Sequence, residues 1–156
     1  MYISLNGDII TGIKGHLPFP EGIVLTRREE REQAFILLFE KSFNEETEIG
    51  EIYDLAIENE VITGSEFVKA LLFKTWENIE AIDPVVEKYC VGWKMSRVSK
   101  VALAVLRLAA CEILYFDDIP VGVSINEAVE LCKKYAAKDD SAFVNGVLGS
   151  LSKEEK

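Results

Sequence analysis

From Thr26 to the end of the chain, apolar residues recur every three or four positions, and this spacing restricts the fold to helices. Strands with one buried face would instead alternate apolar and polar residues at every second position, and no such alternation follows residue 25. The stretch from Ser99 to Phe116 is the most apolar segment, which predicts a central helix buried on most sides. The sequence therefore predicts an all-α domain with short connections.

Short polar motifs predict where the individual helices begin. In a capping box, a Ser or Thr hydroxyl and a Glu three residues later satisfy two backbone N–H groups of the first turn. Such boxes are Thr26 with Glu29, Thr63 with Glu66, and Ser124 with Glu127. Asp83 before Pro84 predicts the start of a short helix, with Trp93 packing beneath the turn that follows it. Together with the apolar periodicity, these signals predict seven helices beginning near residues 26, 49, 63, 83, 99, 124 and 140.

Residues 1–24 differ in sequence pattern from the rest of the chain, because glycine and proline interrupt short β-type segments at Met1–Leu5 and Asp8–Ile13. We interpret residues 1–24 as an irregular N-terminal extension of unknown role, or as the product of a misassigned translation start. The only histidine, His16, lies in this extension and is more typical of a surface residue without a specific role than of a metal ligand. Residues 25–153 are predicted to form one helical domain.

Charge is distributed unevenly along the chain, which carries a formal net charge of -10. A protein this acidic is not expected to bind nucleic acid through bulk electrostatic attraction, which requires clustered Lys and Arg. However, the segment from Lys88 to Cys111 contains five basic and no acidic residues, whereas the segment from Ser42 to Val68 contains eight acidic and no basic residues. These segments are either solvated faces without further role or a functional polarity of the molecule.

The sequence lacks the motifs of common catalytic and cofactor-binding sites. It has no glycine-rich phosphate loop, no H-E-x-x-H motif and no G-x-S-x-G nucleophile elbow. Cys90, Cys111 and Cys132 stand among apolar residues without a C-x-x-C pair, which predicts buried, reduced thiols rather than a metal site. We therefore expect no enzyme activity, no cofactor and no metal. Reduced thiols, with no export signal and no apolar run of membrane-spanning length, predict a cytoplasmic protein.

Three arginines near the start of the first predicted helix are candidates for a binding site. At about 100° per residue, Arg27, Arg28 and Arg31 point to the same side of the helix as the apolar stripe that follows them. Burying three guanidinium groups would be prohibitive, so the first turn is expected to overhang the bundle and present a basic edge. Guanidinium groups on such an edge can contact phosphates bidentately and stack on bases. The alternative is that they pair weakly with neighbouring glutamates.

Four separated sequence segments occur in the order typical of one protein family. They are the arginine cluster, Val105–Ala109 with Glu112–Leu114, Asp117–Leu131, and Phe143–Leu148. At these residues the chain resembles the NusB family of bacterial transcription antitermination factors, over roughly residues 25–151. The resemblance implies a seven-helix NusB-like bundle of two antiparallel helical subdomains, in which the first three helices pack against the last four.

The resemblance also implies a function in RNA binding. In NusB-type proteins the arginine-rich turn binds the boxA element of nascent RNA together with residues at the start of the final helix, which here match Asp140 and Phe143. Phe143 either stacks on an unpaired base or anchors the last helix in the core. Lys100, in the acid-free segment, completes the set of expected RNA contacts.

The resemblance further implies partners. NusB-like proteins bind RNA well only as a heterodimer with NusE, a ribosomal small-subunit protein. With other Nus factors they act on the RNA polymerase elongation complex and promote processive transcription of ribosomal RNA operons. An acidic adaptor with a local basic edge fits this mechanism, because it binds nonspecific RNA poorly and gains specificity by combination with a partner.

The chain departs from the family pattern in three places. Family members often have a basic residue where Glu29 or Glu30 stands, an acidic residue where Ala102 stands, and one extra residue between the Asp140 region and Phe143. Two other functions remain open. One is a non-catalytic protein-interaction module of the same fold, such as a homodimer, without direct RNA binding. The other is the RNA-binding domain of an RNA cytosine methyltransferase, which would require that the nucleotide-binding domain has been removed.

Overall fold

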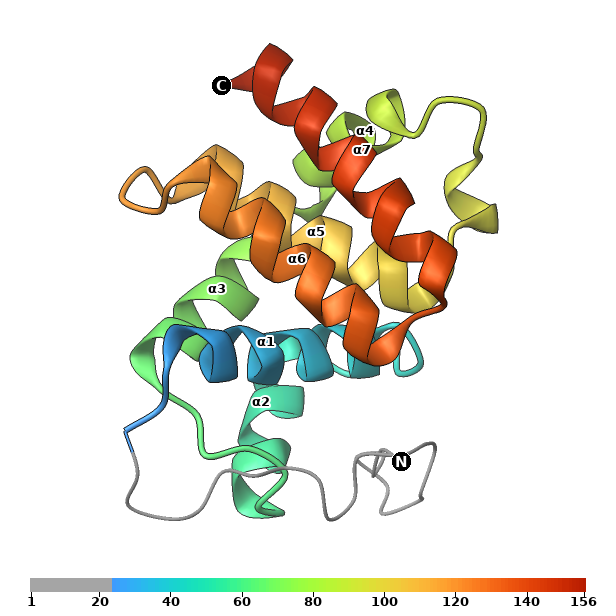
Figure 1. The fold of residues 1–156 in the computed structure, drawn as a ribbon. Coiled ribbons are helices and arrows are strands. Elements are labelled where there is room, and N and C mark those ends of the chain that lie inside the picture. Colours follow the sequence, from blue (N-terminus) through green and yellow to red (C-terminus); the bar gives the residue numbers. More distant parts are fainter. Residues whose placement is uncertain (1–23) are drawn as a thin grey trace. The chain divides into compact units, whose positions relative to one another are not determined.

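The computed structural model describes residues 24–156, which form seven α-helices and one short 3-10 helix (Figure 1). The α-helices are α1 (Arg27–Lys41), α2 (Ile49–Glu58), α3 (Glu66–Glu77), α4 (Ile79–Tyr89), α5 (Lys100–Tyr115), α6 (Val121–Tyr135) and α7 (Lys138–Glu155). The 3-10 helix η1 (Met95–Arg97) lies between α4 and α5. The prediction of an all-α, seven-helix fold is confirmed for the described residues. The predicted extension lies outside them except for Val24, and so do its β-type segments and His16.

The described residues divide into two compact units, the first ending at Phe73 and the second comprising Lys74–Lys156, and the division falls inside α3. The first unit holds α1, α2 and most of α3. The second holds the end of α3 together with α4 to α7. This division agrees with the expected three-helix and four-helix subdomains.

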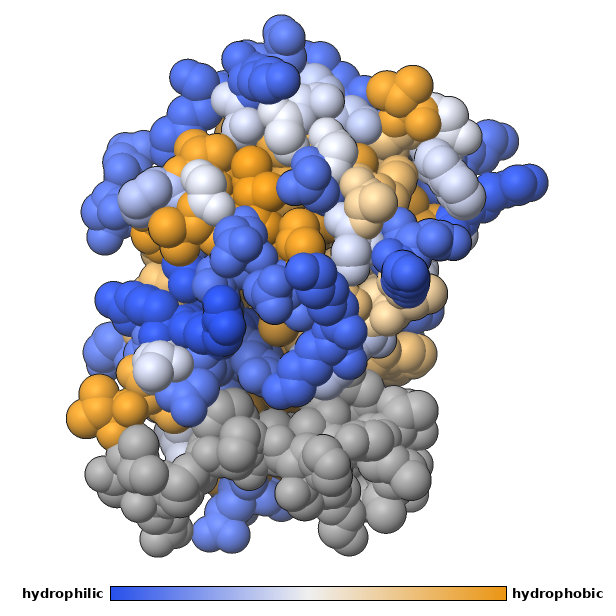
Figure 2. Space-filling view, viewed as in Figure 1, coloured by the Kyte–Doolittle hydropathy of each residue, from blue (hydrophilic) through white to orange (hydrophobic). Residues whose placement is uncertain are grey.

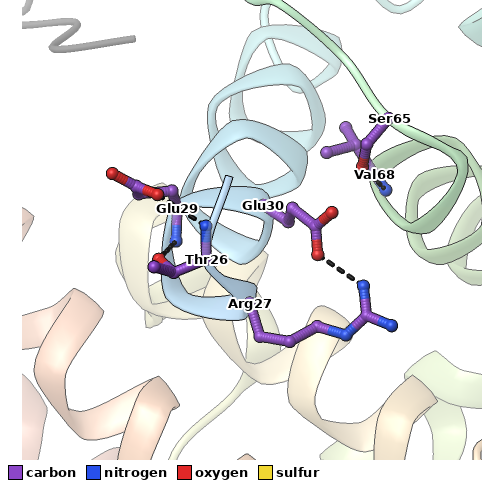
Figure 3. Close-up of polar contacts among 6 residues, drawn as sticks. All are labelled: Thr26, Arg27, Glu29, Glu30, Ser65 and Val68. Carbon is purple, nitrogen blue, oxygen red and sulfur yellow. Dashed lines mark hydrogen bonds and ion pairs between the residues drawn. The ribbon is translucent and has the colours of Figure 1, made fainter. Parts of the chain in front are cut away.

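α1 begins with the capping box that the sequence predicts (Figure 3). The backbone N–H of Thr26 donates to Glu29 Oε2 at 2.6 Å, and the backbone N–H of Glu29 donates to Thr26 Oγ1 at 3.2 Å. The hydrogen bonds from the backbone and then the side chain of Thr26 lower the pKa of the Glu29 carboxyl, because they favour its charged form. Beyond this first turn, every residue of α1 from Glu30 to Lys41 is buried.

A buried glutamine of α1 holds the connection between α2 and α3. The side chain of Gln33 is fully buried, its Nε2 donates to Thr63 Oγ1, and its Oε1 accepts from the backbone N–H of Gly64, each at 2.9 Å. Both ends of the amide therefore have partners, which is the condition for burying a polar group at low cost. Gly64 has a positive φ of 72°, a conformation that glycine adopts without the steric penalty of a side chain.

The predicted capping box of Thr63 and Glu66 is wrong. The Thr63 hydroxyl accepts a hydrogen bond from Gln33 of α1 instead of capping a helix, and α3 begins at Glu66. Ser65 instead accepts a hydrogen bond through its Oγ from the backbone N–H of Val68 at 3.1 Å (Figure 3). The helix start therefore lies two to three residues later than predicted.

A buried lysine at the end of α1 organises the loop before α2. Lys41 is 5% exposed, and its Nζ donates to the backbone carbonyls of Asn44 at 3.3 Å, Thr47 at 2.7 Å, and Glu45. These carbonyls follow the end of the helix, where backbone acceptors have no intrahelical partner. The ammonium group therefore closes the loop on itself and stabilises the turn into α2.

Replacing Lys41 with methionine is expected to lower the free energy of unfolding by about 2 kcal/mol, because the loop carbonyls lose a charged donor while the apolar stem is retained. The measurement is urea unfolding followed by circular dichroism. The matched control is Lys69→Met, since Lys69 is an exposed lysine of the same unit. Equal stability of the two variants would show that the Lys41 hydrogen bonds do not hold the loop.

α5 is the central helix of the second unit, as its apolar sequence predicts. It packs against α4, α6 and α7, and α5 to α7 run beside one another in Figure 1. Its middle residues are buried; those from Ala104 to Leu106 are at most 3% exposed. The predicted start is also confirmed, because Ser99 is the N-cap and its Oγ accepts from the backbone N–H of Ala102 at 3.1 Å.

The predicted start of the fourth helix is wrong. α4 begins at Ile79, and Pro84 lies inside the helix. Asp83 does not cap it, since both of its carboxylate oxygens bind Arg107 of α5: Oδ1 accepts from Nε at 2.8 Å and Oδ2 from Nη2 at 2.7 Å. This bidentate ion pair joins α4 to α5, and bidentate geometry is the strongest form of such a pair.

The predicted capping box of Ser124 and Glu127 is also wrong. α6 begins three residues earlier, at Val121, with Pro120 as its N-cap residue. Ser124 lies inside the helix and its Oγ donates to Glu112 Oε1 of α5 at 2.9 Å, with both residues 2% exposed. The final helix likewise begins at Lys138, two residues before the predicted start at Asp140.

The three cysteines are free and buried, as predicted. Burial raises the pKa of the Cys111 thiol to about 11 and that of Cys132 to about 12, so both remain protonated at neutral pH. Among the helices that the structure describes, none is long and apolar enough to cross a lipid bilayer.

Candidate nucleic-acid interface

The first turn of α1 presents Arg27 at the surface of the first unit (Figure 3). Its Nη1 lies 2.5 Å from Glu30 Oε2, and the Arg27 side chain is 61% exposed while that of Glu30 is 10% exposed. The centre of the guanidinium group also lies 4.0 Å from the ring centroid of Phe67 in α3, within cation–π range. Arg27 is therefore held in place on one side by a carboxylate and an aromatic ring, and remains accessible on the other.

The other two arginines of the cluster differ from each other in exposure. Arg28 is exposed, whereas Arg31 is only 5% exposed and lies 5.7 Å from the Phe67 ring centroid. The prediction that the first turn presents all three guanidinium groups is wrong for Arg31, because that side chain is buried one turn further along the helix. The exposed basic edge consists of Arg27 and Arg28.

The second unit contains a pocket of about 180 Å³ at the start of α7. It is lined by Trp93, Arg97, Val98, Ser99, Asp139, Asp140 and Phe143. The rings of Trp93 and Phe143 contact each other, with centroids 5.9 Å apart and planes inclined by 60°. The pocket thus combines an aromatic wall, two carboxylates and a guanidinium group.

The pocket forms because the segment between α4 and α5 folds back toward the first turn of α7. Gly92 turns the chain with a positive φ of 81°, and η1 then leads to Ser99 at the start of α5. The Ser99 hydroxyl lies 3.2 Å from Asp140 Oδ2, which ties the start of α5 to the start of α7. Phe143 follows Asp140 by about one helical turn, so both side chains reach the same side of α7.

The family of the chain follows from its sequence relatives. A family model described as the NusB family matches residues 28–153. The chain belongs to the NusB family. A transcription antitermination protein NusB from Ruminiclostridium cellulolyticum is 44% identical over 129 residues, which are 81% of this chain and 88% of that protein. The protein of the same name from Clostridium acetobutylicum is 43% identical over 135 residues, which are 85% of this chain and 100% of that protein.

Solved NusB structures share the fold. NusB of T. maritima superposes with a TM-score of 0.75 at 31% identity and covers 85% of this chain and 94% of its own. A chain from a crystal structure of the antitermination factors NusB and NusE in complex with double-stranded RNA gives a TM-score of 0.73 at 30% identity, with 81% and 96% coverage. These matches agree with the NusB-like fold expected from the sequence.

The site residues expected from the NusB resemblance belong to both units. Arg27, Arg28 and Arg31 lie in α1 of the first unit, whereas Asp140 and Phe143 line the pocket of the second unit. Lys100 is exposed at the first position of α5. Phe143 is half-buried beside the pocket, whereas the core of α7 consists of Val144, Val147, Leu148 and Leu151.

Two pocket residues were missed as candidate site residues. Trp93, predicted to pack beneath a turn, is 55% exposed, and Arg97 is exposed in η1. Both belong to the acid-free segment from Lys88 to Cys111, and that segment was the sequence signal that pointed to them.

Proposed function

We propose that this NusB-family chain is a transcription antitermination factor that binds boxA-type single-stranded RNA together with NusE. In this role it joins the RNA polymerase elongation complex with other Nus factors in the cytoplasm and promotes processive transcription of ribosomal RNA operons. The observation that carries the proposal is the exposed Arg27 and Arg28 pair on the first turn of α1, in a chain whose relatives are antitermination proteins. The related complex of NusB, NusE and double-stranded RNA supports NusE and RNA as partners.

The contacts of Arg27 suggest how the turn receives RNA. Phe67 and Glu30 already order the side chain, so little conformational entropy is lost when the guanidinium group meets a phosphate. A phosphate competes with the Glu30 carboxylate for the same N–H donors. Binding to the isolated chain is therefore weakened by the internal ion pair and by the net charge of -10.

The second unit has a surface suited to a protein partner. Hydrophobic residues gather over α5 and α6 (Figure 2), and Tyr115 and Val123 on these helices are exposed. Exposed apolar patches on a folded protein mark interaction sites. A bound NusE would add its own RNA-binding surface to that of this chain.

Titration of labelled boxA RNA with and without NusE tests the proposal. We expect weak, salt-sensitive binding to the chain alone and clearly tighter binding when NusE is present. With two phosphate contacts on a single strand, from Arg27 and Arg28, the slope of log K against log salt concentration for the chain alone is about -1.4. Folded protein that gives no RNA response in either case would contradict the proposal. A stable homodimer in sedimentation, with no RNA binding, would instead favour an interaction module of the same fold.

A further inference from the structure

The turn between α4 and η1 carries two exposed apolar side chains. Val91 is 85% exposed, more than any other large apolar residue of the second unit, and Trp93 is 55% exposed. Single apolar residues at a protein surface are ordinary, but neighbouring ones that are held outward together are typical of contact sites. We call Val91, Gly92 and Trp93 the apolar tip.

Backbone geometry fixes the shape of the apolar tip. The backbone N–H of Trp93 donates to the carbonyl of Cys90 at 3.0 Å, which closes a four-residue turn. Gly92 is the third residue of this turn and has the positive φ, 81°, that a type II turn requires at that position. Nothing lies within 4 Å of a Cβ built on Gly92, so no other part of the described chain covers the turn.

Packing holds both ends of the apolar tip. Cys90, which precedes the tip, is 3% exposed, and the ring of Trp93 lies against that of Phe143 in α7, with centroids 5.9 Å apart. Trp93 therefore has one supported side and one exposed side. Because the turn and the indole ring are already ordered, binding of a partner to the tip costs little conformational entropy.

The charge beside the apolar tip is positive. Lys94 follows the tip directly and is exposed, and the segment that contains it has no acidic residue. Arg97 is also exposed, but it shares its pocket with Asp139 and Asp140, which offset its charge. Lys94 is therefore the cation through which the tip selects a negatively charged partner.

Among negatively charged partners, the apolar tip favours a protein. An aliphatic side chain has no π-face on which a base can stack, so Val91 adds nothing to RNA binding. An anionic lipid surface is recognised by clusters of about four to eight cations, whereas this tip has one adjacent lysine in a chain of net charge -10. An apolar recess with an acidic rim on a protein would bury both apolar side chains and pair with Lys94.

We propose that the apolar tip docks into an apolar recess with an acidic rim on a protein of the RNA polymerase elongation complex other than NusE. Val91 and Trp93 enter the recess, and Lys94 pairs with the rim. The inference rests on the proposed function, which brings the chain to that complex through boxA RNA. It adds a second attachment, made to protein rather than to RNA, at residues separate from the exposed basic edge.

Binding to two targets tests the second attachment. The affinity of the fluorescein-labelled chain, bound to NusE, is measured by anisotropy for free boxA RNA and for a stalled elongation complex that carries the same RNA and the other Nus factors. We expect the elongation complex to be bound about tenfold more tightly, which is the effect of one strong interface anchor. Equal affinities for the two targets would overturn the proposal.

A double variant assigns the tenfold difference to the apolar tip. Val91→Ser with Lys94→Glu should abolish the difference, because it removes the aliphatic anchor and reverses the charge. The matched control is Val24→Ser with Lys153→Glu, which makes the same changes at an exposed valine and an exposed lysine and should retain the difference. Both double variants should bind free boxA RNA equally. Weaker RNA binding by the tip variant than by the control would place the tip on RNA and overturn the proposal.

Photo-crosslinking identifies the occupant. Val91 is replaced by the photoreactive residue benzoylphenylalanine, and the assembled elongation complex is irradiated. A crosslink to a protein of that complex other than NusE supports the proposal. A crosslink to NusE, to RNA or to a second copy of the chain, or no crosslink, would overturn it.

The two proposals fail in different ways. If the wild-type chain binds no boxA RNA even with NusE, the proposed function fails, and the crosslink to RNA polymerase or another Nus factor still tests the apolar tip. If boxA RNA binds but the elongation complex adds no affinity and gives no crosslink, the tip assignment fails and the proposed function stands.

Discussion

Replacing Gly64 with alanine is expected to lower the free energy of unfolding by about 2 kcal/mol. The residue has a positive φ of 72°, which is costly for any residue with a Cβ atom. A Cβ built at this position would also lie 2.5 Å from the Tyr53 hydroxyl oxygen and 2.6 Å from Ile57 Cδ1. Both side chains of α2 would have to move, and the loss is measured by urea unfolding.

Two other glycines separate the causes of this loss. Gly92 has a positive φ of 81°, but nothing lies within 4 Å of a Cβ placed there, so Gly92→Ala should cost only about 1 kcal/mol. Gly122 lies in α6 with open space around it, and Gly122→Ala should raise the stability by about 0.5 to 1 kcal/mol. If Gly64→Ala were no more harmful than Gly92→Ala, the contacts with α2 would not constrain this turn.

Signals that depend only on neighbouring residues were predicted well from the sequence. The predicted capping box of Thr26 and Glu29 formed, and α5 begins at the predicted position with Ser99 as its N-cap, because each side chain bonds the backbone within three residues. The apolar periodicity identified α5 as the central helix for the same reason, since a helix face repeats locally. Helix number and class were therefore accessible without a structure.

The wrong helix starts share one physical cause. Thr63 binds Gln33 of α1, Asp83 binds Arg107 of α5, and Ser124 binds Glu112. In each case a side chain able to cap a helix instead forms a hydrogen bond with a partner 12 to 30 residues away in the sequence. A local motif contains no information about such a partner, so tertiary contacts overrode the capping preference.

The candidate site was only partly predictable for a similar reason. Asp140 and Phe143 came from the family resemblance, but their pocket depends on Trp93 and Arg97, which precede them by more than 40 residues. The burial of Arg31 was not foreseen either. The helical angle placed it correctly beside the apolar stripe, but the argument that burial would be prohibitive left out the contacts a buried guanidinium group can make, of which the cation–π contact with the ring of Phe67 is one.

Removing the exposed basic edge should produce the largest functional effect. The double variant Arg27→Ala with Arg28→Ala is expected to weaken boxA RNA binding by roughly 10- to 100-fold, because two charged hydrogen-bond donors to phosphate are lost. Its free energy of unfolding should change by less than about 1 kcal/mol, since Arg27 is largely exposed and exposed ion pairs contribute little. Arg31 is retained in this variant because its burial gives it a structural role.

The same double variant should also alter the salt dependence of binding. Loss of two phosphate contacts makes the slope of log K against log salt concentration shallower by about 1.4 on a single strand. The matched control is Lys69→Ala with Lys153→Ala, which removes two positive charges from exposed positions of α3 and α7. An equal loss of affinity in this control would mean that net charge, rather than the first turn of α1, governs binding.

The most direct test of RNA binding by the exposed basic edge is a comparison of two affinities. The affinity of boxA RNA for the complex with NusE is measured at one salt concentration, for the wild-type chain and for the Arg27→Ala, Arg28→Ala double variant. If Arg27 and Arg28 contact RNA phosphates, the affinity falls by at least about tenfold in a variant that unfolds at the same urea concentration as the wild type. Wild-type RNA affinity in that folded double variant would contradict RNA binding by the exposed basic edge.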